Sequence, residues 1–181
     1  ERRYMESHLA GDESELRIQT MAKYFGALKK SLSAERIQSY ATYIEQESTP
    51  FAVDPFLVAS VMIAKSDMEW TSRSQKRYGL MRIDWDEHRK WIYRDYPNVR
   101  SLRILFKPVI NIRIGARILK DDIVKNAGDV DRALERNYTW DNLSAPQEIF
   151  THYKNLVALF REMNEMQPPV PAATPSVTES K

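Results

Sequence analysis

The sequence predicts a mostly α-helical fold, and three observations support this prediction. Only five of the 181 residues are glycine. The alternating apolar and polar patterns that mark β-strands are scarce, whereas apolar residues recur at helical spacing between recognisable capping residues. With 43% hydrophobic and 29% charged residues, the composition is typical of a globular domain with a sizeable core.

Three helices are expected before the middle of the chain. The first fills residues 13–30. The second follows Ser33, a suitable N-cap, and ends before Pro50, because the residue that precedes a proline disfavours the helical conformation. The third begins at Asp54-Pro55, an N-cap followed by proline at the first helical position, and ends near Lys65. Since almost every residue between these points is apolar, this helix should be deeply buried.

A polar loop over residues 66–83 should separate the third helix from the next. Aromatic and apolar residues at helical spacing then predict a helix over residues 84–95. Pro108 opens a long helix that continues to about residue 126. Its apolar face is wide, so this helix should lie near the centre of the fold.

Two shorter signals mark the remaining helices. Gly128 ends the long helix, and Asp129 caps the next one, which runs through Leu134. The segment Ser144-Ala145-Pro146-Gln147 has the pattern of a capping box and starts a last helix through Phe160. The predicted division is an N-terminal helical extension over residues 1–34, a principal domain over residues 35–165, and a proline-rich, disordered tail over residues 166–181.

Composition argues against several classes of protein. The net charge is +2, from 27 basic and 25 acidic residues, so a nucleic-acid partner bound through excess positive charge is not expected. No apolar stretch approaches the roughly 20 residues that span a bilayer. The chain has no cysteine, which excludes disulfides and thiolate chemistry. Its three histidines lack the spacing of metal ligands, so neither a metal nor another cofactor is expected.

Short motifs occur in a characteristic order along the chain. They are Asp54-Pro55-x-Leu57-Val58-Ala59, Lys65-Ser66, Tyr78-Gly79-Leu80-Met81, Asn111-Ile112-Arg113-x-Gly115, Gly128-Asp129 with Ala133-Leu134, Asn137-Tyr138, and Tyr153-x-x-Leu156-Val157-Ala158-Leu159-Phe160. This series resembles the soluble lytic transglycosylase domain, related to goose-type lysozyme, over residues 35–162. The resemblance implies a lysozyme-like helical fold, peptidoglycan as the substrate, and a location in the periplasm or cell envelope.

Such domains cleave the β-1,4 bond between N-acetylmuramic acid and N-acetylglucosamine. The family uses one glutamate, placed before a serine at the end of the D-P-x-L-V helix, first as acid and then as base. A glycosidic oxygen is a poor leaving group, so a carboxylic acid must protonate it as the bond breaks. Burial at the end of an apolar helix supplies the raised pKa that this acid needs.

Lys65 stands at the position of this glutamate, directly before Ser66. An ammonium with a reference pKa of about 10.4 is too weak an acid for this step, and its charge would repel a developing oxocarbenium ion. A structural role alone would also explain a lysine at position 65, because the helix dipole stabilises a cation at a helix C-terminus by about 0.3–1 kcal/mol. The substitution predicts a domain without its catalytic acid.

Other departures from the family pattern also fall on cleft residues. Arg82 replaces the glutamine of G-L-M-Q, and the bulky Tyr78 replaces a small residue. Asn137-Tyr138 occupies the place of a Tyr-Asn pair, whereas the residues that supply packing are kept. By the resemblance, the substrate cleft comprises Lys65, Ser66, Tyr78, Gly79, Leu80, Met81, Arg82, Asn137 and Tyr138.

We therefore expect a degenerate lytic transglycosylase-like domain that is not catalytic and binds peptidoglycan or a protein partner in the cell envelope. Two alternatives remain open. One is an active lytic transglycosylase with a substitute carboxylate, for which Glu69, on the loop after Lys65, is the fallback. The other is a protein-interaction module whose cleft is filled by Lys65, Tyr78 and Arg82.

Two further groups of residues have simple structural explanations. Glu47-Ser48 repeats the family dipeptide, but it precedes the third helix and is expected at a solvated helix end. Trp85, Trp91 and Tyr93 could stack on sugar rings, although aromatic residues at helical spacing more often belong to a core.

Overall fold

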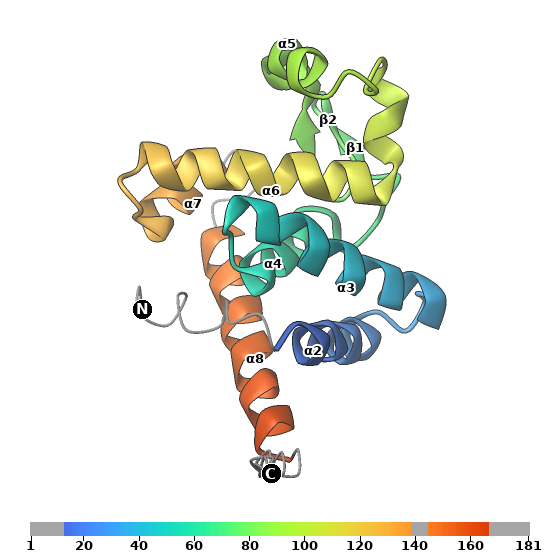
Figure 1. Ribbon diagram of the computed structural model, residues 1–181, viewed down its shortest axis with the longest axis vertical. Helices are drawn as coiled ribbons and strands as arrows, with labels where there is room; N and C mark the ends of the chain where they lie inside the picture. The colour runs from blue at the N-terminus through green and yellow to red at the C-terminus, as the bar shows by residue number, and fades with distance from the viewer. Residues whose placement is uncertain (1–12, 139–144, 167–181) are drawn as a thin grey trace, which may run out of the picture.

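The computed structural model describes residues 13–138 and 145–166, and these are mostly helical, which confirms the predicted class (Figure 1). The α-helices are α2 (Ser14–Leu28), α3 (Ala34–Ser48), α4 (Pro55–Ser66), α5 (Trp85–Asp95), α6 (Pro108–Lys125), α7 (Val130–Tyr138) and α8 (Ala145–Glu165). Two 3-10 helices, η2 (Thr49–Phe51) and η3 (Leu102–Phe106), and three short strands, β1 (Arg73–Ser74), β2 (Arg77–Tyr78) and β3 (Ile83–Asp84), complete the elements.

Helix α4 is the centre of the fold. It packs against α2, α3, α6 and α8, and its residues from Pro55 to Ile63 are all buried. Its start is fixed by Asp54, whose carboxylate accepts a hydrogen bond from the Phe56 amide at 2.8 Å. The same carboxylate accepts a hydrogen bond from the Tyr153 hydroxyl at 2.7 Å, which ties α8 to the beginning of α4. The expectation that this helix is deeply buried is confirmed.

Helix α2 packs against α3 and α8. Met21 and Phe25 are fully buried and belong to the same core as α4. The buried Arg17 side chain pairs with Glu45 of α3, with Nε to Oε2 at 2.9 Å. A buried cation requires such a partner, because an unpaired charge in the interior is costly.

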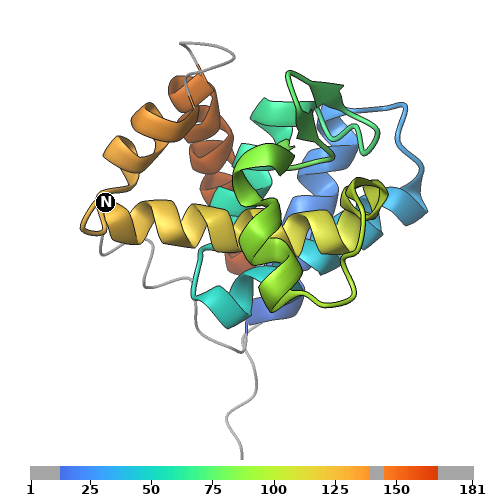
Figure 2. The same cartoon turned by 90° about the horizontal axis from the view of Figure 1, so that it is seen from above.

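Helix α6 lies between α4 and α5, and α5 crosses it on the side away from α4 (Figures 1 and 2). The α5–α6 contact includes an ion pair from Arg117 Nη2 to Asp95 Oδ2 at 2.7 Å. The Arg117 guanidinium also lies over the Trp91 ring at 4.5 Å. The central position predicted for this long helix is therefore confirmed.

The predicted helix starts are confirmed where they lie in the described part of the chain. Ser33 accepts a hydrogen bond from the Arg36 amide at 3.3 Å, and Asp129 accepts one from the Arg132 amide at 3.0 Å. Helix α7 continues past the predicted Leu134. The capping serine at 144 and the tail from 167 to 181 lie outside the described residues.

The loop expected over residues 66–83 contains a small antiparallel sheet with the order β1-β2-β3. Gln75 and Lys76 join β1 to β2 with φ angles of 47° and 67°. Two positive φ angles in succession match a type I′ hairpin turn, which usually contains asparagine or glycine. Neither asparagine nor glycine occurs at this turn, so the sequence does not predict a hairpin there.

None of the helices in the described ranges combines the length and apolar character needed to cross a bilayer.

Candidate functional site

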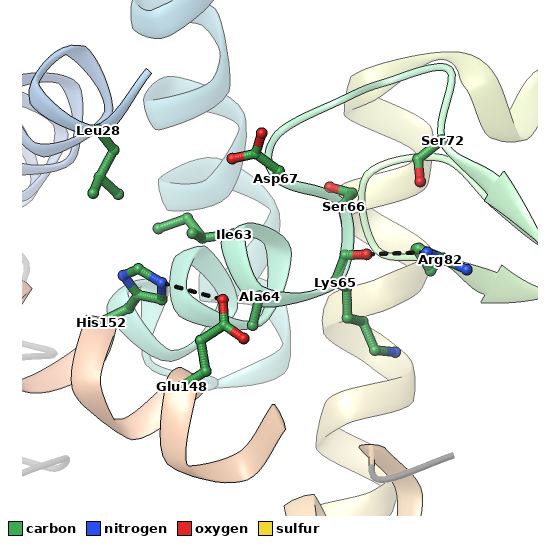
Figure 3. Close-up of a pocket in the computed structure, with 10 residues that line it drawn as sticks. All are labelled: Leu28, Ile63, Ala64, Lys65, Ser66, Asp67, Ser72, Arg82, Glu148 and His152. Carbon is green, nitrogen blue, oxygen red and sulfur yellow. Dashed lines mark hydrogen bonds and ion pairs between the residues drawn. The ribbon is translucent and has the colours of Figure 1, made fainter. Parts of the chain in front are cut away.

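A polar cavity of about 440 Å³ lies at the C-terminal end of α4 (Figure 3). Its walls come from the ends of α2 and α4, the loop that follows α4, and the first turns of α8. The lining residues are Leu28, Ile63, Ala64, Lys65, Ser66, Asp67, Ser72, Arg82, Glu148 and His152. Three of the residues that the sequence assigned to a cleft, Lys65, Ser66 and Arg82, are therefore brought together here.

Helix α4 ends at this cavity because Asp67 adopts the left-handed conformation, with φ of 47°, and its amide donates to the Ile63 carbonyl at 2.8 Å. The turn exposes Asp67, which pairs with Lys29 Nζ at 2.9 Å. The Ser66 hydroxyl donates to the Met62 carbonyl at 2.9 Å, so its hydrogen is directed into the helix rather than into the cavity.

Lys65 is linked to the following loop by two hydrogen bonds of opposite direction. Its ammonium donates to the Met81 carbonyl at 3.3 Å. Its own carbonyl accepts from the Arg82 guanidinium at 3.4 Å. The residue that the resemblance aligns with a catalytic glutamate is thus a half-buried cation with a second cation, Arg82, beside it.

Helix α6 holds the loop that contains Gly79. The Asn111 side chain accepts from the Met81 amide at 2.7 Å and donates to the carbonyls of Tyr78 at 2.9 Å and Leu105 at 2.7 Å. Gly79 has φ of 78°, and a Cβ on it would lie 2.2 Å from Asn111 Nδ2 and 2.4 Å from the Leu105 carbonyl oxygen. Only glycine fits this position.

Gly115 has a similar role one helical turn further along α6. A Cβ there would lie 2.4 Å from Met81 Cγ. Leu80 and Met81, the two residues that follow Gly79 in this loop, are buried. Asn111 and Gly115, which belong to one predicted motif, therefore position Gly79, Leu80 and Met81, which belong to another.

Gly79, Leu80 and Met81 are not among the residues that line the cavity. Tyr78 is half-buried, and its ring packs edge-on against Phe106 at 6.0 Å between centroids. It is not among the residues that line the cavity. Asn137 and Tyr138 end α7, and their side chains lie outside the described part of the structure.

Glu69 has the wrong environment for a substitute acid. It is exposed, and it accepts hydrogen bonds from the Thr71 hydroxyl at 2.7 Å and the Thr71 amide at 3.2 Å. These bonds stabilise the charged form and lower the pKa of Glu69. A general acid for glycoside cleavage needs the opposite shift.

Asp122 on α6 is the carboxylate with that opposite shift. It is 8% exposed, and burial raises its pKa, an effect that the charges of Lys125 and Lys65 oppose. It does not line the cavity. The position of Asp122 in the sequence does not predict this burial or the raised pKa, because aspartate in the last turns of a helix is ordinarily exposed.

The sequence reasoning did not select Glu148 and His152, which line the cavity from α8. Their Oε1 and Nε2 atoms are 3.8 Å apart. His152 Nδ1 also contacts the Tyr24 hydroxyl at 2.9 Å, and burial lowers the pKa of His152. The only available signal was a spacing of four residues, which places two side chains on one helix face.

The expected solvated helix end at Glu47 is wrong. Glu47 is 8% exposed, and both of its carboxylate oxygens bind Arg113, at 2.6 and 2.8 Å. Such two-point pairing is the strong form of this interaction. The explanation of the aromatic cluster as core residues is confirmed for Trp85, which is buried. Tyr93 is exposed, and its ring lies nearly perpendicular to that of Trp85, with 5.4 Å between the ring centroids.

Within the described ranges, no three histidine or acidic side chains are grouped so that they could hold a metal ion. Comparison of the chain with known protein families, with curated proteins and with solved structures found no match.

Proposed function

We propose that this chain is a degenerate lytic transglycosylase-like domain with a lysozyme-like fold, which binds peptidoglycan glycan strands in the cell envelope without cleaving them. The observation that carries the proposal is the environment of Lys65. A cation that donates to a backbone carbonyl, with Arg82 bound to its own carbonyl, stands where the family motif has its acid. The carbonyl contact stabilises the ammonium, and neither cation offers a proton of suitable acidity.

The motif residues that do not take part in chemistry support the resemblance. Asn111 makes three hydrogen bonds to the loop and to η3, and Gly79 and Gly115 fit positions that no larger residue can occupy. Motifs that are far apart in the sequence thus contact each other, as parts of one scaffold should. A scaffold can persist when its chemistry is lost, since function resides in the site rather than in the fold.

Neither acidic residue on the loop after α4 replaces the missing acid. Hydrogen bonds lower the pKa of Glu69, and Asp67 is exposed and paired with Lys29. Asp122 and Glu148 are the remaining rivals. Burial raises the pKa of Asp122, although it lies outside the cavity, and Glu148 lines the cavity from α8.

Incubation with purified peptidoglycan sacculi tests the proposal. We expect the protein to sediment with the sacculi and to release no soluble anhydro-muropeptides. Release of these products by the unaltered chain would overturn the non-catalytic proposal, and its loss in Asp122→Asn or Glu69→Gln would identify the acid. Failure to sediment would instead favour a protein-interaction module.

The Lys65→Glu variant tests whether the remaining cleft is intact. If the family scaffold is preserved, this variant should release anhydro-muropeptides. Lys23→Glu makes the same charge change at an exposed position on α2 and serves as the matched control. Product from both variants would show that the charge change alone, rather than position 65, is responsible.

A further inference from the structure

Glu148 and His152 lie side by side on α8, at the edge of the cavity (Figure 3). The distance of 3.8 Å between Glu148 Oε1 and His152 Nε2 is too long for a direct hydrogen bond, which has a length of about 2.7–3.2 Å. The Glu148 side chain is 44% exposed, so a ligand can reach it.

A chain of hydrogen bonds sets the proton position on His152. Asn155 Nδ2 donates to the Tyr24 hydroxyl oxygen at 3.2 Å. The Tyr24 hydroxyl contacts His152 Nδ1 at 2.9 Å, and we assign it as the donor because its hydrogen then has an acceptor and Nε2–H faces the Glu148 carboxylate. In this assignment Nε2 carries the hydrogen of the neutral ring, and burial, which lowers the pKa of His152, favours the neutral form.

The cavity edge therefore presents a donor, His152 Nε2–H, beside an acceptor, the Glu148 carboxylate. A hydroxyl can satisfy both, because its oxygen accepts from the imidazole while its hydrogen is donated to the carboxylate. An ammonium could only donate, and a carboxylate could only accept.

The rest of the cavity combines apolar and polar walls. Ile63, Ala64 and the partly exposed Leu28 offer apolar surface, and the side chains of Ser66 and Ser72 offer hydroxyl oxygens. A sugar ring has the matching chemistry, with hydroxyls around its edge and C–H groups on its faces.

We propose that Glu148 and His152 form a carbohydrate-binding site in which the two side chains bridge one sugar hydroxyl. This site rests on the proposed function and deepens it. It names two residues that hold the glycan and that lie outside the family-like motifs. Both residues come from the first turns of α8 and face the end of α4 that carries Lys65.

Titration of the full chain with soluble N-acetylglucosamine trimer, followed by calorimetry, tests the site. We expect Glu148→Gln to weaken binding about tenfold, because the neutral amide loses the charge-assisted hydrogen bond from the sugar hydroxyl. His152→Phe, which keeps an aromatic ring but removes Nε2–H, should weaken binding as well. Glu162→Gln, an exposed residue on the same helix, is the matched control and should change affinity less than about twofold.

Amide chemical shifts of the unaltered chain give a second measurement that requires no variant. Trimer should shift residues at the start of α8 and the end of α4, and shifts confined to other elements would overturn the site. Equal affinity of Glu148→Gln and the unaltered chain would also overturn it.

Sacculus sedimentation of the same proteins separates this inference from the proposed function. If the unaltered chain and Glu148→Gln sediment equally, the Glu148 site is wrong while peptidoglycan binding stands. If trimer binding depends on Glu148 but nothing sediments, the carbohydrate site stands and the peptidoglycan proposal is wrong. Binding to neither probe overturns both.

Discussion

The loop around Gly79 and the cavity at the end of α4 meet where Lys65 contacts Met81, but they differ in how their residues are held. In the loop, Asn111 satisfies three backbone groups, and added atoms on Gly79 would overlap its neighbours. In the cavity, Lys65 is half-buried and Glu148 is 44% exposed. Packing therefore restricts the loop to few residue types, whereas the cavity can change its charges without disturbing the core.

The largest effect should come from Gly79→Ala. A Cβ there would lie 2.4 Å from a backbone oxygen, and the φ of 78° is unfavourable for alanine. Backbone strain and overpacking together should destabilise the fold by about 3–5 kcal/mol. Gly26→Ala is the control, because its Cβ would make only an ordinary contact of 3.6 Å with Ile37. Chemical denaturation measures both, and equal stability of the two variants would contradict the interlocked loop.

A smaller but substantial loss is expected for Asn111→Leu, which keeps a similar volume but removes every hydrogen bond of the side chain. The Met81 amide and the carbonyls of Tyr78 and Leu105 would lose a partner in a buried position. Leaving these groups unsatisfied should destabilise the protein by about 2–4 kcal/mol. Urea unfolding measures the loss, and a value below about 1 kcal/mol would show that the loop does not depend on this side chain.

The smallest effect is expected for Asp122→Asn, and it should depend on pH. Burial raises the pKa of Asp122 in the folded protein, so ionisation costs stability once the pH exceeds the unfolded value of about 3.9. The variant should therefore melt about 1–3 °C above the unaltered protein at pH 7, and the difference should vanish below pH 4.

Asp121→Asn, at the exposed neighbouring position, is the control for this comparison and should leave the melting temperature nearly unchanged at both pH values. A lower melting temperature of Asp122→Asn at pH 7 would mean that attraction to Lys125 and Lys65 outweighs burial.

Features that depend on neighbouring residues could be predicted from the sequence, and features that depend on distant contacts could not. Asp54-Pro55 fixes the start of α4 through an interaction that spans only three residues, so the sequence alone predicts this helix start. Glu47 was misassigned because its partner, Arg113, lies 66 residues away.

The same division applies to the residues that line the cavity. Lys65, Ser66 and Arg82 surround one helix end and could be grouped by motif. Glu148 and His152 reach the same place only because α8 packs on α4, and a single sequence contains no direct record of that contact. The hairpin turn was missed for a different reason, since Gln75 and Lys76 adopt positive φ angles without the usual residue types.

The 3.3 Å contact between Lys65 Nζ and the Met81 carbonyl has a consequence for any residue placed at position 65. A carbonyl oxygen can only accept, so its partner must supply a hydrogen. Lysine does so, and a neutral carboxylic acid could, but an ionised carboxylate would face the oxygen's lone pairs. A glutamate introduced here would therefore be drawn in two directions, because this carbonyl favours its protonated form and the Arg82 guanidinium beside it favours its ionised form.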